Sequence, residues 1–253
     1  MRRLLILILA AAVCAGCAST PKGPVRYRAQ VVAEYPHDPS SYTQGLFFYD
    51  GALYESVGQY GESAMRRVKL ETGRGERTVS LGMDIFAEGA TVLDTTLYIL
   101  TWQNGLVFRC DPVSFAVREK VEYPREGWGL TTDGKQLIAS DGSDYLFFLD
   151  EDLQTVRTLH VTQEGLGRRY LNELEYIDGK IWANVYTRDE ILIINPDNGR
   201  VEGIVDCSGL LPARDRDLRT DVLNGIAHDP VSGKTYLTGK YWKKLFEIEL
   251  VKK

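Results

Sequence analysis

The chain contains little cysteine, and this shortage excludes a disulfide-stapled scaffold. Only four of its 253 residues are cysteine. Cys110 and Cys207 are the two in the body of the chain, and two cysteines are too few to hold a fold together. The fold must therefore depend on an apolar core, and the chain is long enough to build one as a single domain.

Histidine is equally scarce, and the common motifs of cofactor chemistry are missing. His37, His160 and His228 lie far apart and no Cys-x-x-Cys pair is present, so a catalytic zinc or a serine-type triad is hard to assemble. There is no phosphate loop and no dinucleotide fingerprint. Any chemistry must be done by carboxylate, amide, indole and lysine groups, so we expect neither a metal nor a cofactor.

Excess positive charge is also absent. The formal net charge is −5, and no stripe of basic and aromatic residues occurs. Proteins that bind nucleic acid neutralise phosphates with lysine and arginine, so nucleic acid is not an expected partner.

Long apolar runs are lacking except at the N-terminus. There Arg2 and Arg3 precede the run Leu4–Val13, which is typical of a bacterial export signal and is shorter than the roughly 20 residues that span a bilayer. Ala15-Gly16-Cys17 matches a lipobox, although Cys14 stands where Leu or Val is usual, so ordinary signal-peptidase cleavage is the alternative. We expect residues 1–17 to be a signal and residues 18–253 to form one periplasmic domain, with membrane contact only through a lipid anchor at Cys17.

Helical periodicity is absent from the rest of the chain, and strand signals take its place. Short runs rich in Tyr, Val, Ile, Leu and Phe alternate with Gly, Asp and Asn. Hairpin turns with positive φ are predicted at Asp50-Gly51, Asp133-Gly134 and Asp178-Gly179, and a fourth at Ser232-Gly233.

These turns separate five copies of one unit, each of about 40 to 50 residues, which is typical of propeller blades. The units begin TQGLF at Thr43, AEGAT at Ala87, GWGLT at Gly127, LNELE at Leu171 and LNGIA at Leu223. The first four units carry four strand-like runs each, and the last carries three.

The missing strand is available at the other end of the domain. The stretch Tyr27–Tyr35 has strand composition, and we expect it to pair with Leu245–Leu250 at the outer edge of the last unit. The sequence therefore predicts an all-β, five-bladed β-propeller closed by an N-terminal strand. Cys110 and Cys207 then lie a whole blade apart and form no disulfide. The insertion Leu210–Asp221 is expected to be a loop or short helix, with a place at the entrance as one interpretation.

One repeated position carries unlike residues, which a purely structural position would not require. Because the first strand of each blade lines the central channel, the second residues of the five units converge on one axis: they are Gln44, Glu88, Trp128, Asn172 and Asn224. The second strands contribute a matching set, Gly58, Trp102, Gly142, Tyr186 and Lys240. Core packing is the alternative for any one aromatic, but the coincidence at equivalent positions favours a binding site.

At these residues the chain resembles the plant-type glutamine cyclotransferases, a family distinct from the zinc-dependent animal cyclases. The matching segments are YTQGLFF, ESVGQYGES, FAEGAT, LYILTWQN, GWGLTTDG, SDGSDYLFFLD, RRYLNELEYIDGKIWAN, DVLNGIAHD and TGKYWKKLFEIEL. The resemblance implies an acyltransferase that converts the N-terminal glutamine of peptides or proteins to pyroglutamate and releases ammonia. Together with the predicted export signal, we expect an exported protein that acts as a monomer.

The resemblance also implies a role for each matching residue. Glu88 would be the central catalytic carboxylate, which takes a proton from the substrate amine and returns it to the leaving nitrogen. Tyr186 stands where family members often have tryptophan. The remaining residues that the resemblance implies are Gln44, Asn172 and Lys240 as polar partners and Phe86, Trp102 and Trp128 as walls. From its place in the repeated ring, we also expect Asn224 to contact substrate.

Two alternatives from other classes stay open on the sequence alone. One is a non-catalytic periplasmic propeller that binds peptides or sugars, and it would tolerate the replacement of Glu88 by Gln. The other is an assembly lipoprotein that docks partners on its blade faces, which would give no reason for the unlike ring.

Overall fold

The computed structural model describes residues 23–253. The predicted signal over residues 1–17, with its lipobox, lies outside the described residues. Within the described part, no helix is long and apolar enough to cross a membrane.

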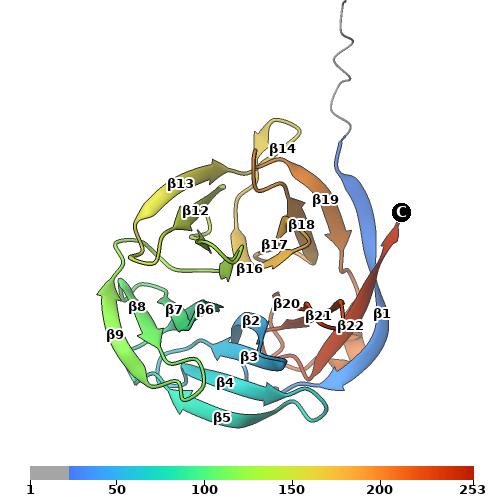
Figure 1. Cartoon of the computed structure of the whole chain (residues 1–253). Coiled ribbons are helices and arrows are strands. Elements are labelled where there is room, and N and C mark those ends of the chain that lie inside the picture. Colours follow the sequence, from blue (N-terminus) through green and yellow to red (C-terminus); the bar gives the residue numbers. More distant parts are fainter. Residues whose placement is uncertain (1–22) are drawn as a thin grey trace, which may run out of the picture.

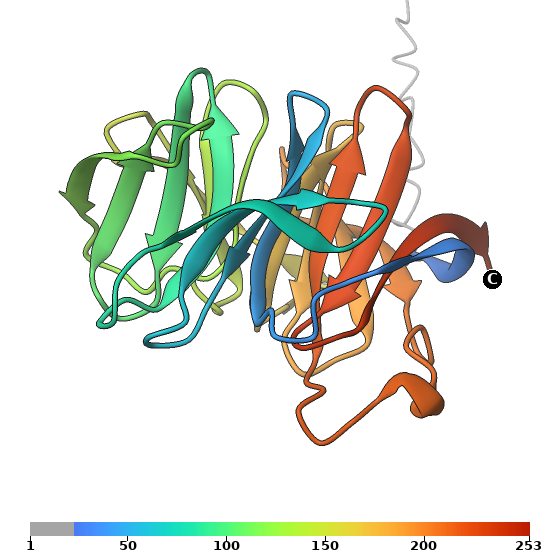
Figure 2. The same ribbon diagram turned by 90° about the horizontal axis from the view of Figure 1, so that it is seen from below.

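The described chain is all-β, as predicted, and its strands are arranged in radial groups around a central axis (Figure 1). Figure 2 shows the same ring from its edge. The first group contains β2 (Thr43–Tyr49), β3 (Ala52–Val57), β4 (Ala64–Lys69) and β5 (Arg74–Ser80). The second contains β6 (Ala87–Leu93), β7 (Thr96–Thr101), β8 (Leu106–Cys110) and β9 (Val117–Glu122). The third contains β10 (Leu130–Thr132), β11 (Leu137–Ser140), β12 (Tyr145–Leu149) and β13 (Thr155–His160).

After a small hairpin, β14 (Thr162–Gln163) and β15 (Leu166–Gly167), the remaining strands form one eight-stranded sheet. Its members are β16 (Leu171–Ile177), β17 (Lys180–Val185), β18 (Glu190–Ile194), β19 (Val201–Asp206), β1 (Val25–Pro36), β20 (Leu223–Asp229), β21 (Lys234–Gly239) and β22 (Lys244–Lys252). The sequence did not predict a joint sheet, and the strand that joins its two halves is β1.

The N-terminal strand β1 lies between two strands that are distant from it in sequence. It pairs antiparallel with β22, from Tyr27 opposite Lys252 to Pro36 opposite Lys244. Its first residues also pair in parallel with β19, with Val25 opposite Gly203. The outer strands of the fourth and last groups are thus connected through β1, and the fold is β-propeller-like.

Packing between neighbouring groups forms the core. Five buried apolar clusters are present in the described chain, and each mainly joins two adjacent groups. Close approach of the inner strands depends on glycine: a Cβ on Gly89 would lie 2.4 Å from the nitrogen of Leu130, and one on Gly129 would lie 2.0 Å from the carbonyl oxygen of Asn172. These two positions must therefore remain glycine.

Two of the predicted hairpins have the expected turn. Asp50-Gly51 and Asp178-Gly179 have positive φ at both residues. Asp133-Gly134 and Ser232-Gly233 differ, because only the glycine has positive φ. In the first of these two turns, the Asp133 carboxylate accepts hydrogen bonds from the backbone of the two residues after Gly134, and this stabilises a longer loop.

Cys110 and Cys207 are both free and buried, which confirms that no disulfide joins them. Burial raises the pKa of both thiols, for Cys110 to about 11. They behave as small apolar residues of the core.

A buried polar cluster fixes the segment that leads into β2. The His37 ring bonds to the Trp242 carbonyl at 2.8 Å and to the Glu55 carboxylate at 2.9 Å. Glu55 also accepts from Thr43 at 2.7 Å, and Arg66 lies within 3.4 Å of it. Because these partners come from the first and last groups, the cluster holds the two ends of the domain together beside the channel.

Two further carboxylates of β16 bridge inner strands deeper in the channel. Glu173 accepts the backbone N–H groups of Leu46 and Ile226, at 3.2 and 2.9 Å. Glu175 accepts the N–H of His228 at 3.0 Å and the hydroxyl of Thr131 at 3.3 Å. Both are buried, and burial raises the pKa of both, for Glu175 to about 8.

The raised pKa of Glu175 predicts that the protein loses stability as the pH rises toward 8. The group is neutral in the folded state up to about pH 8 but ionises near its ordinary pKa when unfolded, so the free energy of unfolding should fall as the pH rises between these values. We expect Glu175→Gln to reduce this fall, measured by urea unfolding at pH 5 and pH 8.5. The exposed Glu122→Gln is the control. An equal fall in wild type and Glu175→Gln would contradict the prediction.

Candidate active site

A cavity of about 250 Å³ opens at the end of the channel where the inner strands begin. It is lined by Tyr42, Gln44, Gln59, Phe86, Glu88, Trp102, Trp128, Asn172, Tyr186 and Lys240. Eight of the nine site residues expected from the sequence are in this set, and they come from all the strand groups.

Irregular strand pairing aims the ring residues at the axis. The register between first and second strands shifts at Gln44, at Glu88, at Asn172 and at Asn224. A β-bulge of this kind re-aims a side chain, and bulges are common beside functional sites. In the third group β10 begins only after Trp128, whose backbone N–H donates to the Ser140 carbonyl at 3.1 Å.

Glu88 is the buried carboxyl of the cavity. Its side chain accepts a hydrogen bond from the Gln44 amide at 2.8 Å, and its backbone carbonyl accepts one from Ser56 at 2.6 Å. Burial raises its pKa well above the ordinary carboxyl value, the nearby Lys240 charge opposes this rise and Glu126 adds to it. A carboxyl with a raised pKa is suited to accept and return a proton near neutral pH.

Lys240 lies across the same cavity and is almost fully buried. Its ammonium lies 4.4 Å from the centre of the Tyr42 ring and 5.3 Å from that of Tyr186, so two aromatic faces stabilise its charge. Burial lowers its pKa, and the charge of Glu88 opposes that change. The two groups interact without an ion pair of 4.0 Å or less in the described chain.

Aromatic rings form the walls. Phe86 and Trp102 meet edge to face with centres 5.4 Å apart, and Trp128 and Tyr186 do so at 5.7 Å. The Trp128 ring also packs onto Gly142, where a Cβ would lie 2.7 Å from the indole. The glycine of the matching set thus makes room for the tryptophan.

The two asparagines of the ring differ in position. Asn172 lines the cavity, and its side chain makes no hydrogen bond within residues 23–253. Asn224 is fully buried behind Gln44: its amide donates to the Thr43 carbonyl at 2.9 Å and to the Gln44 side chain at 3.3 Å. The structure therefore gives Asn224 no contact with the cavity, and it supports Gln44 instead.

Sequence reasoning missed three residues at this site. Tyr42 and Gln59 line the cavity, and Glu126 binds its walls. All three lie outside the repeated ring positions. Tyr42 and Glu126 directly precede two of the predicted units, and Gln59 follows a predicted second strand. Gln59 has φ of 91°, a strained conformation for a residue other than glycine, and such strain is often found at functional sites.

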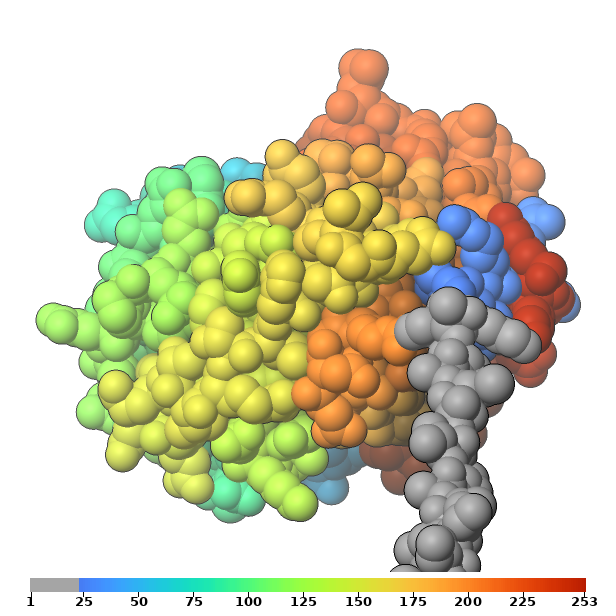
Figure 3. All heavy atoms as spheres, turned by 90° about the horizontal axis from the view of Figure 1, so that it is seen from above, coloured from blue at the N-terminus to red at the C-terminus, as the bar shows by residue number. Residues whose placement is uncertain are grey.

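The insertion after β19 stands beside the cavity. It forms a loop with one short 3-10 helix, Ala213–Asp215, and projects beyond the rest of the ring in Figure 3. The guanidinium carbon of Arg219 lies 4.4 Å from the centre of the Tyr241 ring. The centres of the Tyr241 and Tyr42 rings are in turn 5.1 Å apart. The insertion therefore reaches the site through two aromatic rings.

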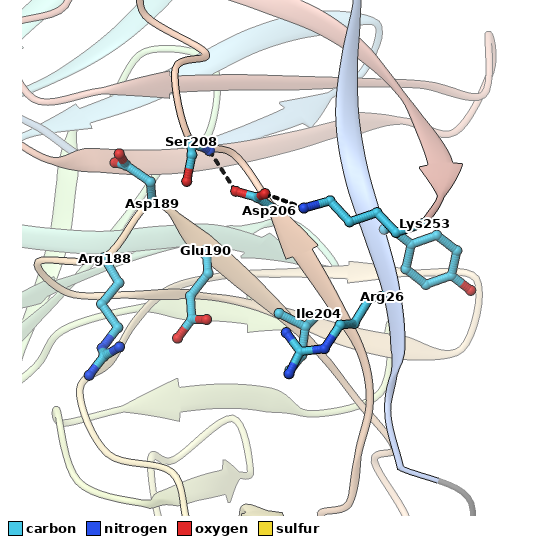
Figure 4. A pocket seen from close by; sticks show the side chains of 9 residues that line it. Arg26, Arg188, Asp189, Glu190, Ile204, Asp206, Ser208 and Lys253 are labelled. Atoms are coloured by element: carbon cyan, nitrogen blue, oxygen red, sulfur yellow. Dashed lines mark hydrogen bonds and ion pairs between the residues drawn. The ribbon is translucent and has the colours of Figure 1, made fainter.

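A larger hollow of about 350 Å³ lies away from the channel, where β1 meets β19 (Figure 4). Two ion pairs lie at its walls: Lys253 binds Asp206, and Arg168 binds Glu190. Unlike the channel cavity, it is lined by no buried charged residue. Among the described residues, no cluster of three or more potential metal ligands occurs at either place.

The fold and the cavity define a class: an all-β, propeller-like protein with a buried carboxyl and a buried lysine between aromatic walls. A family model described as glutamine cyclotransferase matches residues 4–250, and the chain belongs to this family. The glutaminyl-peptide cyclotransferase of Arabidopsis thaliana is 40% identical over 228 residues, which are 87% of this chain and 71% of that protein. The crystal structure of Myxococcus xanthus glutaminyl cyclase matches with a TM-score of 0.85 at 37% identity and covers 91% of this chain and 99% of that one.

Proposed function

We propose that this protein converts the N-terminal glutamine of peptides and proteins to pyroglutamate with release of ammonia. The observation that carries the proposal is Glu88, a buried carboxyl with a raised pKa in a cavity shared with Lys240. The names of the Arabidopsis and Myxococcus relatives support the same reaction. The reaction is intramolecular, so the protein has to hold the pose, move protons and stabilise charge, and no cofactor is part of the proposal.

The first step is proton transfer. An α-amine has a reference pKa of about 7.7 to 8.0, so the substrate arrives largely as an ammonium and must lose a proton before it can attack. Glu88 accepts this proton. The raised pKa of its carboxyl brings the two groups closer in proton affinity, which makes the transfer easier than it would be to an ordinary carboxylate.

Glu88 also serves the steps in which bonds form and break. The amine nitrogen forms a bond to the γ-carboxamide carbon, and the carbonyl oxygen becomes an oxyanion. Glu88 gives its proton to the carboxamide nitrogen, the oxyanion re-forms the carbonyl double bond, the bond from carbon to that nitrogen breaks, and ammonia leaves. The ring nitrogen now carries one proton more than it has in the product. Glu88 accepts this proton and releases it to solvent, which restores the carboxylate.

The oxyanion needs donors that are already in place. The Gln44 amide is engaged by Glu88, whereas Asn172 makes no side-chain hydrogen bond within the described chain. We assign the oxyanion to Asn172 and Lys240, and keep Gln44 as the group that orients Glu88. Loss of one such donor costs about 2.7 to 4 kcal/mol of transition-state stabilisation in a well-studied hydrolase.

The walls serve the substrate's aliphatic part. Phe86, Trp102, Trp128 and Tyr186 would hold the bent glutamine side chain and exclude water from the reacting atoms. Tyr186 additionally supports Lys240 through its ring face.

Finer features of the organisation belong to the same proposal. We propose that residues 18–253 form a single five-bladed propeller in which β1 completes the last blade, and that it works as a monomer without nucleic acid. We also propose an export signal over residues 1–17 and a periplasmic protein anchored by a lipid at Cys17. Cys17→Ser should then move the protein from the membrane fraction to the soluble periplasmic fraction, and an unchanged distribution would contradict the anchor.

The reaction is tested by incubating the purified protein with a dipeptide that begins with glutamine. We expect release of one ammonia per dipeptide, with a matching mass loss in the peptide. The same dipeptide with an acetylated amine is the control, because it cannot cyclise by this route. No ammonia from the free dipeptide would overturn the proposal.

A further inference from the structure

Glu126 occupies an unusual place beside the cavity. It lies on the segment between β9 and β10, and its side chain is exposed. One of its oxygens accepts the indole N–H of Trp102 at 3.1 Å and that of Trp128 at 3.3 Å. A single carboxylate oxygen therefore joins two walls of the cavity that come from different strand groups.

The second oxygen of Glu126 is also occupied. It accepts the side-chain amide of Gln103 at 2.9 Å, so the carboxylate receives three neutral donors. No lysine, arginine or histidine forms an ion pair with Glu126 anywhere in residues 23–253. Its interactions thus serve the two indoles and one amide rather than the neutralisation of a cation.

The backbone on both sides of Glu126 is fixed. The Tyr123 N–H donates to the Gly105 carbonyl at 2.8 Å, and the Gly127 N–H donates to the Thr101 carbonyl at 3.0 Å. A Cβ on Gly127 would lie 2.6 Å from the Cβ of Leu100, so this residue packs against β7. An exposed side chain on a fixed backbone can hold other groups in place.

The two indoles have little else that could orient their polar edges. Trp102 and Trp128 contact Phe86 and Tyr186 edge to face, contacts that are apolar and allow the rings to tilt. The hydrogen bonds to Glu126 are directional and charge-assisted, so they select one orientation for each indole.

We propose that Glu126 is a positioning residue, whose carboxylate sets the orientation of Trp102 and Trp128 and thereby the shape of the cavity that receives the glutamine side chain. The kinetic part of this inference rests on the proposed function. A misplacement of about 1 Å in a positioning group can cost as much as 10²-fold in rate, so the effect should be measurable.

Two substitutions separate positioning from charge. Glu126→Gln removes the charge but keeps an oxygen that can accept both indoles, while the amide of Gln103 can turn to accept the new N–H. Glu126→Ala removes the acceptor altogether. We expect Glu126→Ala to lower kcat/KM for a glutaminyl dipeptide by about tenfold or more, with Glu126→Gln within about threefold of wild type. Glu122→Ala, an exposed carboxylate of β9 without a side-chain hydrogen bond in the described chain, is the matched control.

A spectroscopic arm does not depend on activity. Trp102 and Trp128 are two of the four tryptophans, so near-ultraviolet circular dichroism and tryptophan emission should change in Glu126→Ala and stay as in wild type in Glu126→Gln and Glu122→Ala. If the wild type releases no ammonia, the proposed function fails while this arm still tests the positioning. Equal losses in the Gln and Ala variants would assign the effect to charge and overturn the proposal, as would wild-type kinetics and spectra in Glu126→Ala.

Discussion

Glu88→Gln should lower kcat for cyclisation by at least a factor of about 10² to 10⁴, the range typical of one general acid–base group. The amide keeps the size of the side chain and can still accept the hydrogen bond from Gln44, so we expect KM to change only a few-fold. What it loses is the ability to take a proton from the ammonium. The measurement is the steady-state rate of ammonia release from a glutaminyl dipeptide.

The pH profile adds a second measurement to the same variant. Protonation of Glu88 removes the base, so wild-type kcat should fall as the pH is lowered, and the raised pKa moves this fall toward neutral pH. Residual activity of Glu88→Gln should lack that acidic limb. Glu175→Gln is the matched control, because it changes a buried carboxyl of the same channel that does not line the cavity. A folded Glu88→Gln protein with kcat within about tenfold of wild type, which is about 1.4 kcal/mol of barrier, would remove Glu88 from the mechanism.

Removal of residues 18–36 should destabilise the whole domain rather than shorten a tail. β1 pairs along almost its full length with β22 and at its start with β19, so its loss exposes two sheet edges and removes the packing of Tyr27 against a buried apolar cluster. Because about 1 kcal/mol corresponds to roughly 2 to 4 °C for a domain of this size, we expect the Tm to fall by about 10 °C or more. Thermal unfolding followed by circular dichroism measures this.

The control for that truncation removes residues 18–22 alone and leaves β1 complete. It should melt like the protein that begins at residue 18. If the longer truncation also kept the wild-type Tm, the N-terminal strand would not be part of the cooperative unit, and closure of the ring through β1 would have to be abandoned.

Much of the strand order could be predicted because strands and turns leave a signal in the residues that form them. Alternating apolar residues and turn signals such as Asp50-Gly51 repeat with the unit, and the repetition itself indicates which residues meet at the axis. Gln44, Glu88 and Asn172 were found in this way, since equivalent positions in a ring must converge.

The missed features depend on contacts that leave no local signal. The parallel pairing of Val25 with Gly203 joins two segments that are far apart in sequence, and the residues of neither segment indicate its partner. Glu126 lies in a loop outside the repeat, and only the folded chain brings its carboxylate to two indoles. Asn224 does occupy the repeated position of the ring. The bulge after Leu223, however, places its side chain behind Gln44 and not in the cavity lining.

The position of β1 between β19 and β22 makes the chain suitable for circular permutation. The backbone N–H of Lys253 donates to the carbonyl of Arg26 at 2.9 Å, so the two ends of the domain meet on the outer rim, far from the cavity. A short linker could join them, and new ends could be opened at an exposed hairpin such as Gly134, where a Cβ would meet no atom within 4 Å. In such a circular permutant β1 would follow β22 directly along the chain, as its neighbour in sequence as well as in the sheet.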